Sequence, residues 1–189
     1  MNPQRTTLPQ STFNGFTGLE LLMVVAIAAI LLVLGVPALQ DFGLRQRMSA
    51  AMNALHTQLE LARHEAIHLN AYVVVCPGDG SVGCSGINDW SRGWIVFSDS
   101  NGDRQYQPDQ DSLQRSEAGL EQIQVQSNSG RSNLRFYPNG SAPGSNTSIT
   151  FCDIRGPEQA RKLVISNLGR IRRDEAPETD ALYCPSGDA

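Results

Sequence analysis

The residues of this chain that most resemble a catalytic site are the five at 64–68, His-Glu-Ala-Ile-His. On a helix, two imidazoles at this spacing can bind Zn²⁺ while the glutamate acts as a general base, as in zinc proteases. At about 100° per residue, however, His64 lies opposite the apolar stripe of its segment, and His68 is also well away from it. A zinc protease needs a third protein ligand, and the only other histidine, His56, is on the same predicted helix. We therefore interpret the histidines as solvent-facing and expect no enzymatic activity, no bound metal and no other cofactor.

A second group of polar residues has the appearance of a calcium loop. The segment Asp99–Asp103 reads Asp-Ser-Asn-Gly-Asp, and Asp109 and Asp111 follow it. Alternating oxygen ligands around a turn glycine are typical of such loops, but the spacing and the closing glutamate of an EF-hand are missing. An Asn-Gly pair between apolar runs is a strong hairpin signal. We favour the hairpin and leave calcium open.

Four cysteines indicate an oxidising compartment. Cys76 and Cys84 bracket a loop rich in Pro and Gly, and Cys152 and Cys184 would tie the C-terminal tail to a strand. Four cysteines allow three connectivities, of which we favour the local pair together with the tail pair. The alternative, a zinc site, lacks any Cys-x-x-Cys pair. Disulfides in a secreted or periplasmic domain are the simpler interpretation.

The segment 169–173, Gly-Arg-Ile-Arg-Arg, could bind phosphate. If it is extended, Arg170 and Arg172 point to the same face and could each hold a phosphate bidentately. Arg173 is adjacent, and Arg161 and Lys162 precede it on a predicted strand. Against DNA binding, four acidic residues follow and could pair with these cations: Asp174, Glu175, Glu178 and Asp180. No aromatic stacking platform is obvious nearby, so we favour a charged strand end or filament interface over DNA capture.

These groups must be positioned by a chain whose N-terminal part is strongly apolar. Leu21–Leu39 carries no charge, and about 20 apolar residues are enough to span a bilayer. A secretory signal has its small-residue cleavage site after its apolar core, and none is present here. Glu20 stands just before the run, where a carboxylate is costly unless it is paired or functional. The run is therefore expected to remain as a membrane anchor.

The segment 15–20, Gly-Phe-Thr-Gly-Leu-Glu, resembles the cleavage and assembly signal of type IV pilins and of the pseudopilins of type II secretion. The resemblance implies that a prepilin peptidase cuts after Gly15 and methylates the new terminal Phe16. It also implies that Glu20 pairs with the Phe16 amine of a neighbouring subunit. The expected organisation is a leader over 1–15, a transmembrane and filament-core helix over 16–42, and a periplasmic head over 43–189. Loss of Arg5 with the leader changes the formal charge from −4 to −5. The mature chain therefore lacks the overall positive charge that would indicate binding to nucleic acid.

The helix is predicted to continue into the head. Apolar residues at alternating three- and four-residue steps form one buried stripe: Met48, Met52, Leu55, Leu59, Ala62, Ala66 and Leu69. Gln46, Arg47, Gln58 and Arg63 lie largely off that stripe. A helix over 17–69 would be roughly 80 Å long, with a kink or local melting expected at Gly35 and Pro37.

After the helix, short β-type runs alternate with Gly, Pro, Asn and Ser clusters. The predicted strands are Ala71–Val75, Gly93–Phe97, Gln122–Val125, Leu134–Tyr137, Ser148–Cys152 and Lys162–Ser166. Short connections favour antiparallel pairing. The prediction is an α+β pilin fold, in which one long N-terminal helix packs on an antiparallel sheet, with no second head domain.

The head resembles the GspH/FimT group, which contains the minor pseudopilin H of type II secretion and the minor pilins FimT and FimU. The resemblance is carried by Val75-Cys76-Pro77, by Trp90 with the segment 93–97, by the segment 99–101 and by the segment 165–172. It covers nearly the whole mature chain, with 110–150 the least clear. Trp90, Trp94 and Phe97 are interpreted as core residues. In FimT-like pilins of competent bacteria, Gly-Arg-x-Arg is linked to DNA binding, and here it matches Gly169, Arg170 and Arg172.

The resemblance implies a non-enzymatic minor pilin that is inserted in the inner membrane and assembles at or near the tip of a type IV pilus. Its expected partners are the prepilin peptidase, the inner-membrane assembly platform, and other minor and major pilins or pseudopilins. Two alternatives stay open. One is a FimT-like DNA-binding pilin acting in natural transformation, and the other is a pseudopilin H acting in protein secretion.

Overall fold

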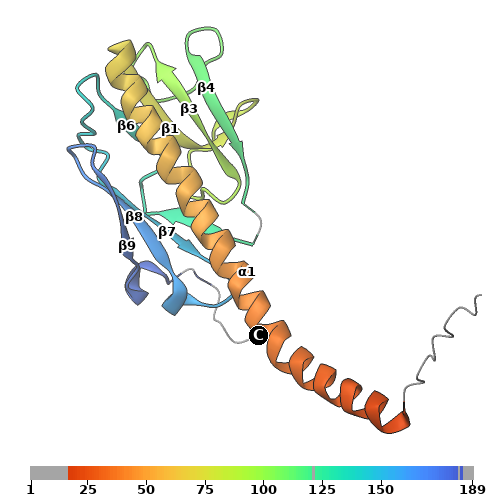
Figure 1. The fold of residues 1–189 in the computed structure, drawn as a ribbon. Coiled ribbons are helices and arrows are strands. Elements are labelled where there is room, and N and C mark those ends of the chain that lie inside the picture. The colour runs from red at the N-terminus through yellow and green to blue at the C-terminus, as the bar shows by residue number, and fades with distance from the viewer. Residues whose placement is uncertain (1–16, 121, 183, 185–189) are drawn as a thin grey trace, which may run out of the picture. The chain divides into compact units, whose positions relative to one another are not determined.

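The computed structural model describes residues 17–120, 122–182 and 184. The chain divides into two compact units, Met1–Gly43 and Leu44–Ala189. One helix, α1 (Gly18–Leu69), contributes residues to both units (Figure 1). It is the one helix in the described part of the chain that is long and apolar enough to cross a membrane.

Thr17 caps the start of α1. Its side-chain oxygen accepts a hydrogen bond from the backbone N–H of Glu20 at 3.3 Å, and its carbonyl accepts the N–H of Leu21 at 3.2 Å. Thr-x-x-Glu is the pattern of a capping box, in which a hydroxyl satisfies one of the free N–H groups of the first turn. The helix therefore begins immediately before the apolar run.

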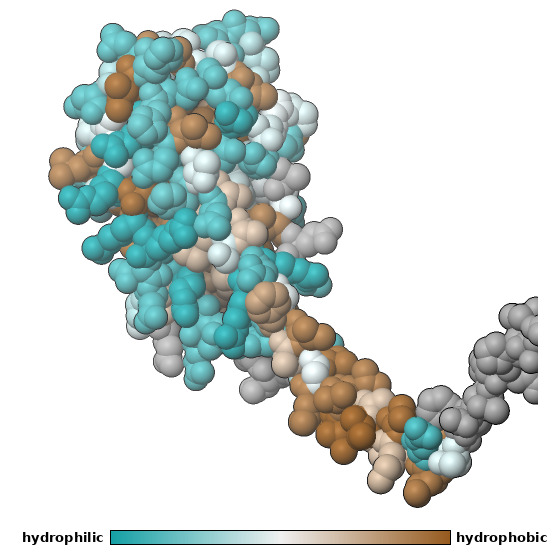
Figure 2. Space-filling model, viewed as in Figure 1, coloured by the Kyte–Doolittle hydropathy of each residue, from teal (hydrophilic) through white to brown (hydrophobic). Residues whose placement is uncertain are grey.

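In the first unit, none of the described residues 18–42 is buried, and Figure 2 shows apolar side chains gathered along this part of the helix. The helix runs unbroken through Gly35 and Pro37. The expected local melting is therefore absent. Proline removes one hydrogen bond, but its fixed φ is compatible with helical geometry, so the flanking turns can continue.

In the second unit, α1 buries the predicted stripe, with two differences. Leu69 is 45% exposed, because the helix ends there and the chain reverses at Asn70, which has φ 50°. Gln58, which was expected off the stripe, is buried. Its amide donates a hydrogen bond to the Glu117 carboxylate at 2.8 Å, which partly offsets the cost of burying a polar group.

All strands of the second unit pair antiparallel, as predicted, but they form two sheets rather than one. The first sheet has the order β2-β1-β3-β4, with β6 also pairing β1, and the second has the order β5-β7-β8-β9. The strands are β1 (Tyr72–Asp79), β2 (Gly83–Cys84), β3 (Gly93–Asp99), β4 (Ser112–Ala118), β5 (Gln124–Ser127), β6 (Leu134–Phe136), β7 (Thr147–Cys152), β8 (Arg161–Ile165) and β9 (Ile171–Glu175). Short 3-10 turns follow β7 (Pro157–Gln159) and β9 (Glu178–Asp180). The sequence did not predict β2, β4 and β9, because these strands are short or largely polar.

The main core lies between α1 and the inner faces of both sheets. Trp90 and Trp94 are fully buried in it, so their interpretation as core residues is confirmed. Two smaller clusters cover the outer faces. One contains Phe97 and Cys76 behind β1 and β3, and the other contains Cys152 behind β7. The α+β class with one long helix and antiparallel sheets is thus confirmed.

Candidate functional site

Glu20 is the predicted assembly residue that the structure describes, whereas Gly15 and Phe16 lie outside the described residues. Glu20 is exposed in the first turn of α1. Its backbone N–H is bonded to Thr17, but its carboxylate has no partner among the described residues. The carboxylate is therefore available to a group from outside. Sequence reasoning missed Thr17, although the Thr-x-x-Glu spacing could have indicated its capping role.

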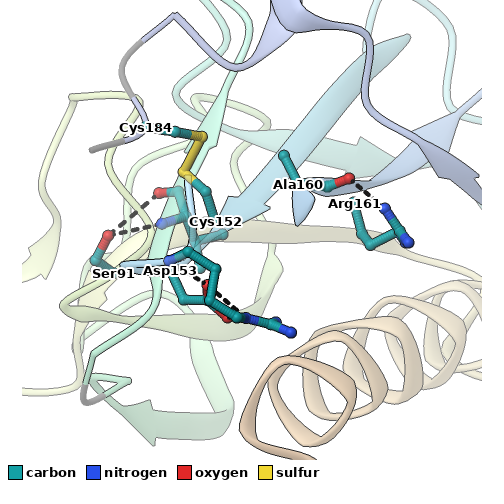
Figure 3. Close-up of a disulfide and its surroundings, with 8 residues drawn as sticks. Ser91, Cys152, Asp153, Ala160, Arg161 and Cys184 are labelled. Carbon is teal, nitrogen blue, oxygen red and sulfur yellow. Dashed lines mark hydrogen bonds and ion pairs between the residues drawn. A yellow bond between two sulfur atoms is a disulfide. The ribbon is translucent and has the colours of Figure 1, made fainter. Parts of the chain in front are cut away.

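Disulfide bonds join Cys76 to Cys84 and Cys152 to Cys184, the pairing favoured from the sequence. Each bond lies in a small apolar cluster on the outer side of one sheet. The bond between Cys152 and Cys184 holds the C-terminal tail against the end of β7 (Figure 3). The cysteines therefore attach chain segments to the outer faces of the sheets.

The basic cluster lies on the β8–β9 hairpin, and the sheet divides it between two faces. Leu163, opposite Arg173 in the register, belongs to the main core, as do Ile165 and Ile171. Because side chains alternate along a strand, Arg161 and Arg173 lie on the helix-facing side of the sheet. Arg172 and Lys162 lie on the outer face. The five cations predicted as one cluster are therefore not brought together.

The acidic residues after the cluster pair with part of it, as the sequence indicated. Lys162 Nζ lies 2.8 Å from the Asp180 carboxylate, and an Arg172 guanidinium nitrogen lies 3.8 Å from Asp174. The second pair is exposed, with side-chain accessibilities of 64% and 47%, and exposed pairs contribute little free energy. Arg170 is exposed in the turn before β9. Arg170 and Arg172 thus remain accessible to an anionic ligand.

Gly169 has a structural role in this hairpin. Its φ is +74°, and a Cβ at this position would lie 2.1 Å from the carbonyl oxygen of Gly140. The same oxygen accepts a hydrogen bond from Arg63 Nε at 2.9 Å. The Gly-Arg-x-Arg pattern therefore begins with a residue that must be glycine for packing. Gly140 was not singled out from the sequence, because a close approach between distant segments leaves no local signal.

The structure places the residues of the two predicted metal motifs in different settings. His64 and His68 are both exposed, as the helix geometry predicted, and the described residues contain no group of His, Cys, Asp or Glu that could hold a metal ion. The carboxylate of Asp99 accepts the backbone N–H groups of Gly102 at 2.8 Å and Arg104 at 3.2 Å. Asp111 similarly accepts the N–H of Ser100. These carboxylates brace the loop of the β3–β4 hairpin, which is longer than a tight Asn-Gly turn.

Known proteins resemble this chain over most of its length. A sequence model of the family described as type II transport protein GspH matches residues 51–169. The pilin-like protein PilA1 of Thermus thermophilus is 31% identical over 166 residues, which cover 85% of this chain and 98% of that protein.

Among solved structures, a crystal structure of the type IV minor pilin FimU of Pseudomonas aeruginosa matches with a TM-score of 0.54 and 21% identity. The match covers 74% of this chain and 96% of FimU. A second crystal form of FimU gives a TM-score of 0.53 at 22% identity, covering 70% and 95%. At this level of identity the likeness shows the fold alone.

Proposed function

Because the chain belongs to the GspH family of minor pilins and pseudopilins, we propose that it is a filament subunit that is processed after Gly15 and assembles at or near the filament tip. The observation that carries the proposal is the exposed apolar part of α1, Gly18–Leu39, which begins with one unpartnered carboxylate, Glu20. Such a surface needs either lipid or the helices of other subunits around it. The periplasmic head would then contact neighbouring pilins, and the partners in processing and extrusion would be the prepilin peptidase and the inner-membrane assembly platform.

Pairing in the filament is proposed to involve Glu20 and the amine of Phe16. A carboxylate within an apolar environment is costly unless an opposite charge compensates it. Thr17 caps the N–H of Glu20, and the Glu20 carboxylate itself makes no capping bond among the described residues. It can accept the amine of a neighbouring subunit.

Two variants test this proposal in the native host. Gly15→Trp should leave an uncleaved, membrane-retained precursor, seen as a larger species on an immunoblot. Glu20→Ala should be cleaved but should be depleted from sheared filaments, and Glu20→Gln is the matched control for side-chain shape. Normal cleavage of the Gly15 variant would contradict the processing site, and wild-type incorporation of Glu20→Ala would contradict the pairing.

DNA capture is a second candidate function, favoured by the exposure of Arg170 and Arg172 on the same hairpin. If alanine at both positions leaves two phosphates without a cation, the slope of log binding constant against log salt concentration should become shallower by about 1.8 for duplex DNA. Fluorescence anisotropy of the detergent-solubilised full chain would compare the double alanine variant with an equal charge change at Arg92 and Arg115, which are exposed elsewhere. An identical slope for both double variants would refute a DNA site at the hairpin.

Membership of a type IV pilus or of a type II secretion system is open to a genetic test. A pseudopilin H function predicts that deletion blocks export of secreted enzymes, whereas a pilus function predicts loss of surface filaments. We favour the pilus, because the relative that is 31% identical over most of this chain is described as a pilin-like protein. A deletion strain that keeps its pili and loses secretion would reverse this choice.

A further inference from the structure

The second unit contains an arginine-lined cleft that the predicted basic cluster did not include. The cleft has a volume of about 380 Å³ and is lined by α1, the segment after β7, β8 and β9. Four of its eight lining residues are arginines, Arg45, Arg155, Arg161 and Arg173, and Met48 and Met52 also line it. Positions far apart in the sequence thus bring four arginines to the lining of one cavity.

The charge in this cleft is predominantly positive. None of the described residues that line it is acidic. Asp153 lies behind Arg155, with the carboxylate 2.6 Å from its guanidinium, and is fully buried, so it offsets the charge of Arg155 but not that of Arg161 or Arg173. Glu175 is opposite Arg161 in the strand register but is exposed to solvent. A bound anion would therefore meet a net positive charge.

Two of the arginines are held in place before any ligand binds. Asp153 accepts three hydrogen bonds from the Arg155 side chain, at 2.6–3.1 Å. A guanidinium nitrogen of Arg161 donates to the carbonyl of Ala160 at 3.0 Å (Figure 3). Planar guanidinium groups match the oxygens of a phosphate. Fixing them in advance lowers the entropy lost when a phosphate binds.

The position of Arg45 in the chain indicates the source of the phosphate. It lies six positions after Leu39, the end of the apolar run, and even an extended chain of that length reaches only about 21 Å. Headgroups occupy the zone just outside the hydrocarbon core. Resting on the membrane anchoring proposed above, we propose that this cleft binds the phosphate of an anionic phospholipid headgroup, with the methionines beside its glycerol portion.

Binding of dihexanoyl phosphatidylglycerol to the full chain in neutral maltoside detergent tests the site. Native mass spectrometry would compare it with dihexanoyl phosphatidylcholine. Arg161→Gln with Arg173→Gln should weaken phosphatidylglycerol binding about tenfold and should weaken phosphatidylcholine binding less, because the choline cation already offsets the phosphate of that lipid. The matched control, Arg92→Gln with Arg115→Gln, removes the same charge from exposed positions elsewhere and should change binding less than twofold. Arg173→Gln alone, on an exposed edge strand, should weaken it about threefold and guards against misfolding of the double variant.

Three results would overturn the proposal. Equal effects of the two double variants would mean general charge attraction, and equal binding of the two lipids would mean that the cleft does not select an anionic headgroup. Displacement of the lipid by millimolar inorganic phosphate or by duplex DNA would assign the cleft to those ligands instead. Because a short-chain lipid reports on the cleft without a bilayer, failure here is distinguishable from failure of anchoring, which carbonate extraction of membranes would measure.

Discussion

Substitution of Gly169 by alanine should destabilise the head through two separable effects. The first is backbone strain, because φ at this position is +74° and a left-handed conformation costs a residue with a Cβ about 1–2 kcal/mol. The second is a collision, because the new Cβ would lie 2.1 Å from the carbonyl oxygen of Gly140. Backbone atoms cannot rotate away as a flexible side chain can.

The collision should be the larger effect. Relief requires the β8–β9 turn and the segment around Gly140 to separate by roughly 1 Å, which also disturbs the hydrogen bond from Arg63 to the same oxygen. Overpacking of this kind costs typically 1–3 kcal/mol. We therefore expect Gly169→Ala to lower the free energy of unfolding by about 2–5 kcal/mol.

Gly144 provides a matched control for the strain alone. Its φ is +71°, and nothing lies within 4 Å of a Cβ built there. Gly144→Ala should therefore cost about 1–2 kcal/mol. The difference between the two variants measures the close approach of Gly169 to Gly140.

Urea unfolding followed by tryptophan fluorescence is a suitable assay. The two tryptophans of the chain, Trp90 and Trp94, are fully buried in the head core, so their emission reports on the head rather than on the membrane segment. A loss of at least 1 kcal/mol beyond the control is expected for Gly169→Ala. If the two variants unfold within 0.5 kcal/mol of each other, the packing role assigned to Gly169 is wrong.

Three further perturbations test other contacts. Replacing Cys152 and Cys184 with serine opens a loop of 32 residues and should lower the free energy of unfolding by about 3.7 kcal/mol through chain entropy. Replacing Cys76 and Cys84 opens a loop of 8 residues and should lower it by about 2.5 kcal/mol. Equal urea midpoints for the two double-serine variants would contradict this difference. Arg155→Met leaves the Asp153 carboxylate buried without its counter-ion and should lower the free energy of unfolding by about 3 kcal/mol. A decrease of less than about 1 kcal/mol would show that the ion pair is not required to compensate the buried carboxylate. A hydroxyl and two backbone N–H groups lower the pKa of Asp79 below 3.8, so its contribution to stability is present above that pH and is lost as pH falls through the lowered pKa. An NMR titration giving a pKa at or above 3.8 would contradict that contact set.

Local patterns were sufficient for the long helix and for most strands. Periodicity placed the stripe from Met48 to Ala66 on the buried side of α1, because helical geometry follows directly from residue spacing. The same geometry placed His64 and His68 away from the buried stripe, and both are exposed in the structure. Where the local signal was weak it failed. The polar edge strands β4 and β9 carry little apolar alternation, and Gln58 is buried because its partner, Glu117, comes from a distant strand.

The sequence by itself determined which residues form the apolar N-terminal run, and it favoured the cysteine pairing that the structure shows. Only the tertiary structure decided how the basic residues are distributed. Strand pairing sends Arg172 to one face of the hairpin and Arg173 to the other, and it brings Arg45 and Arg155 beside Arg161. Arg45 and Arg155 are 110 positions apart, and Gly140 and Gly169 are 29 apart. Each pair meets only when the elements of the head pack, so no local spacing encodes either the cleft or the contact of the two glycines.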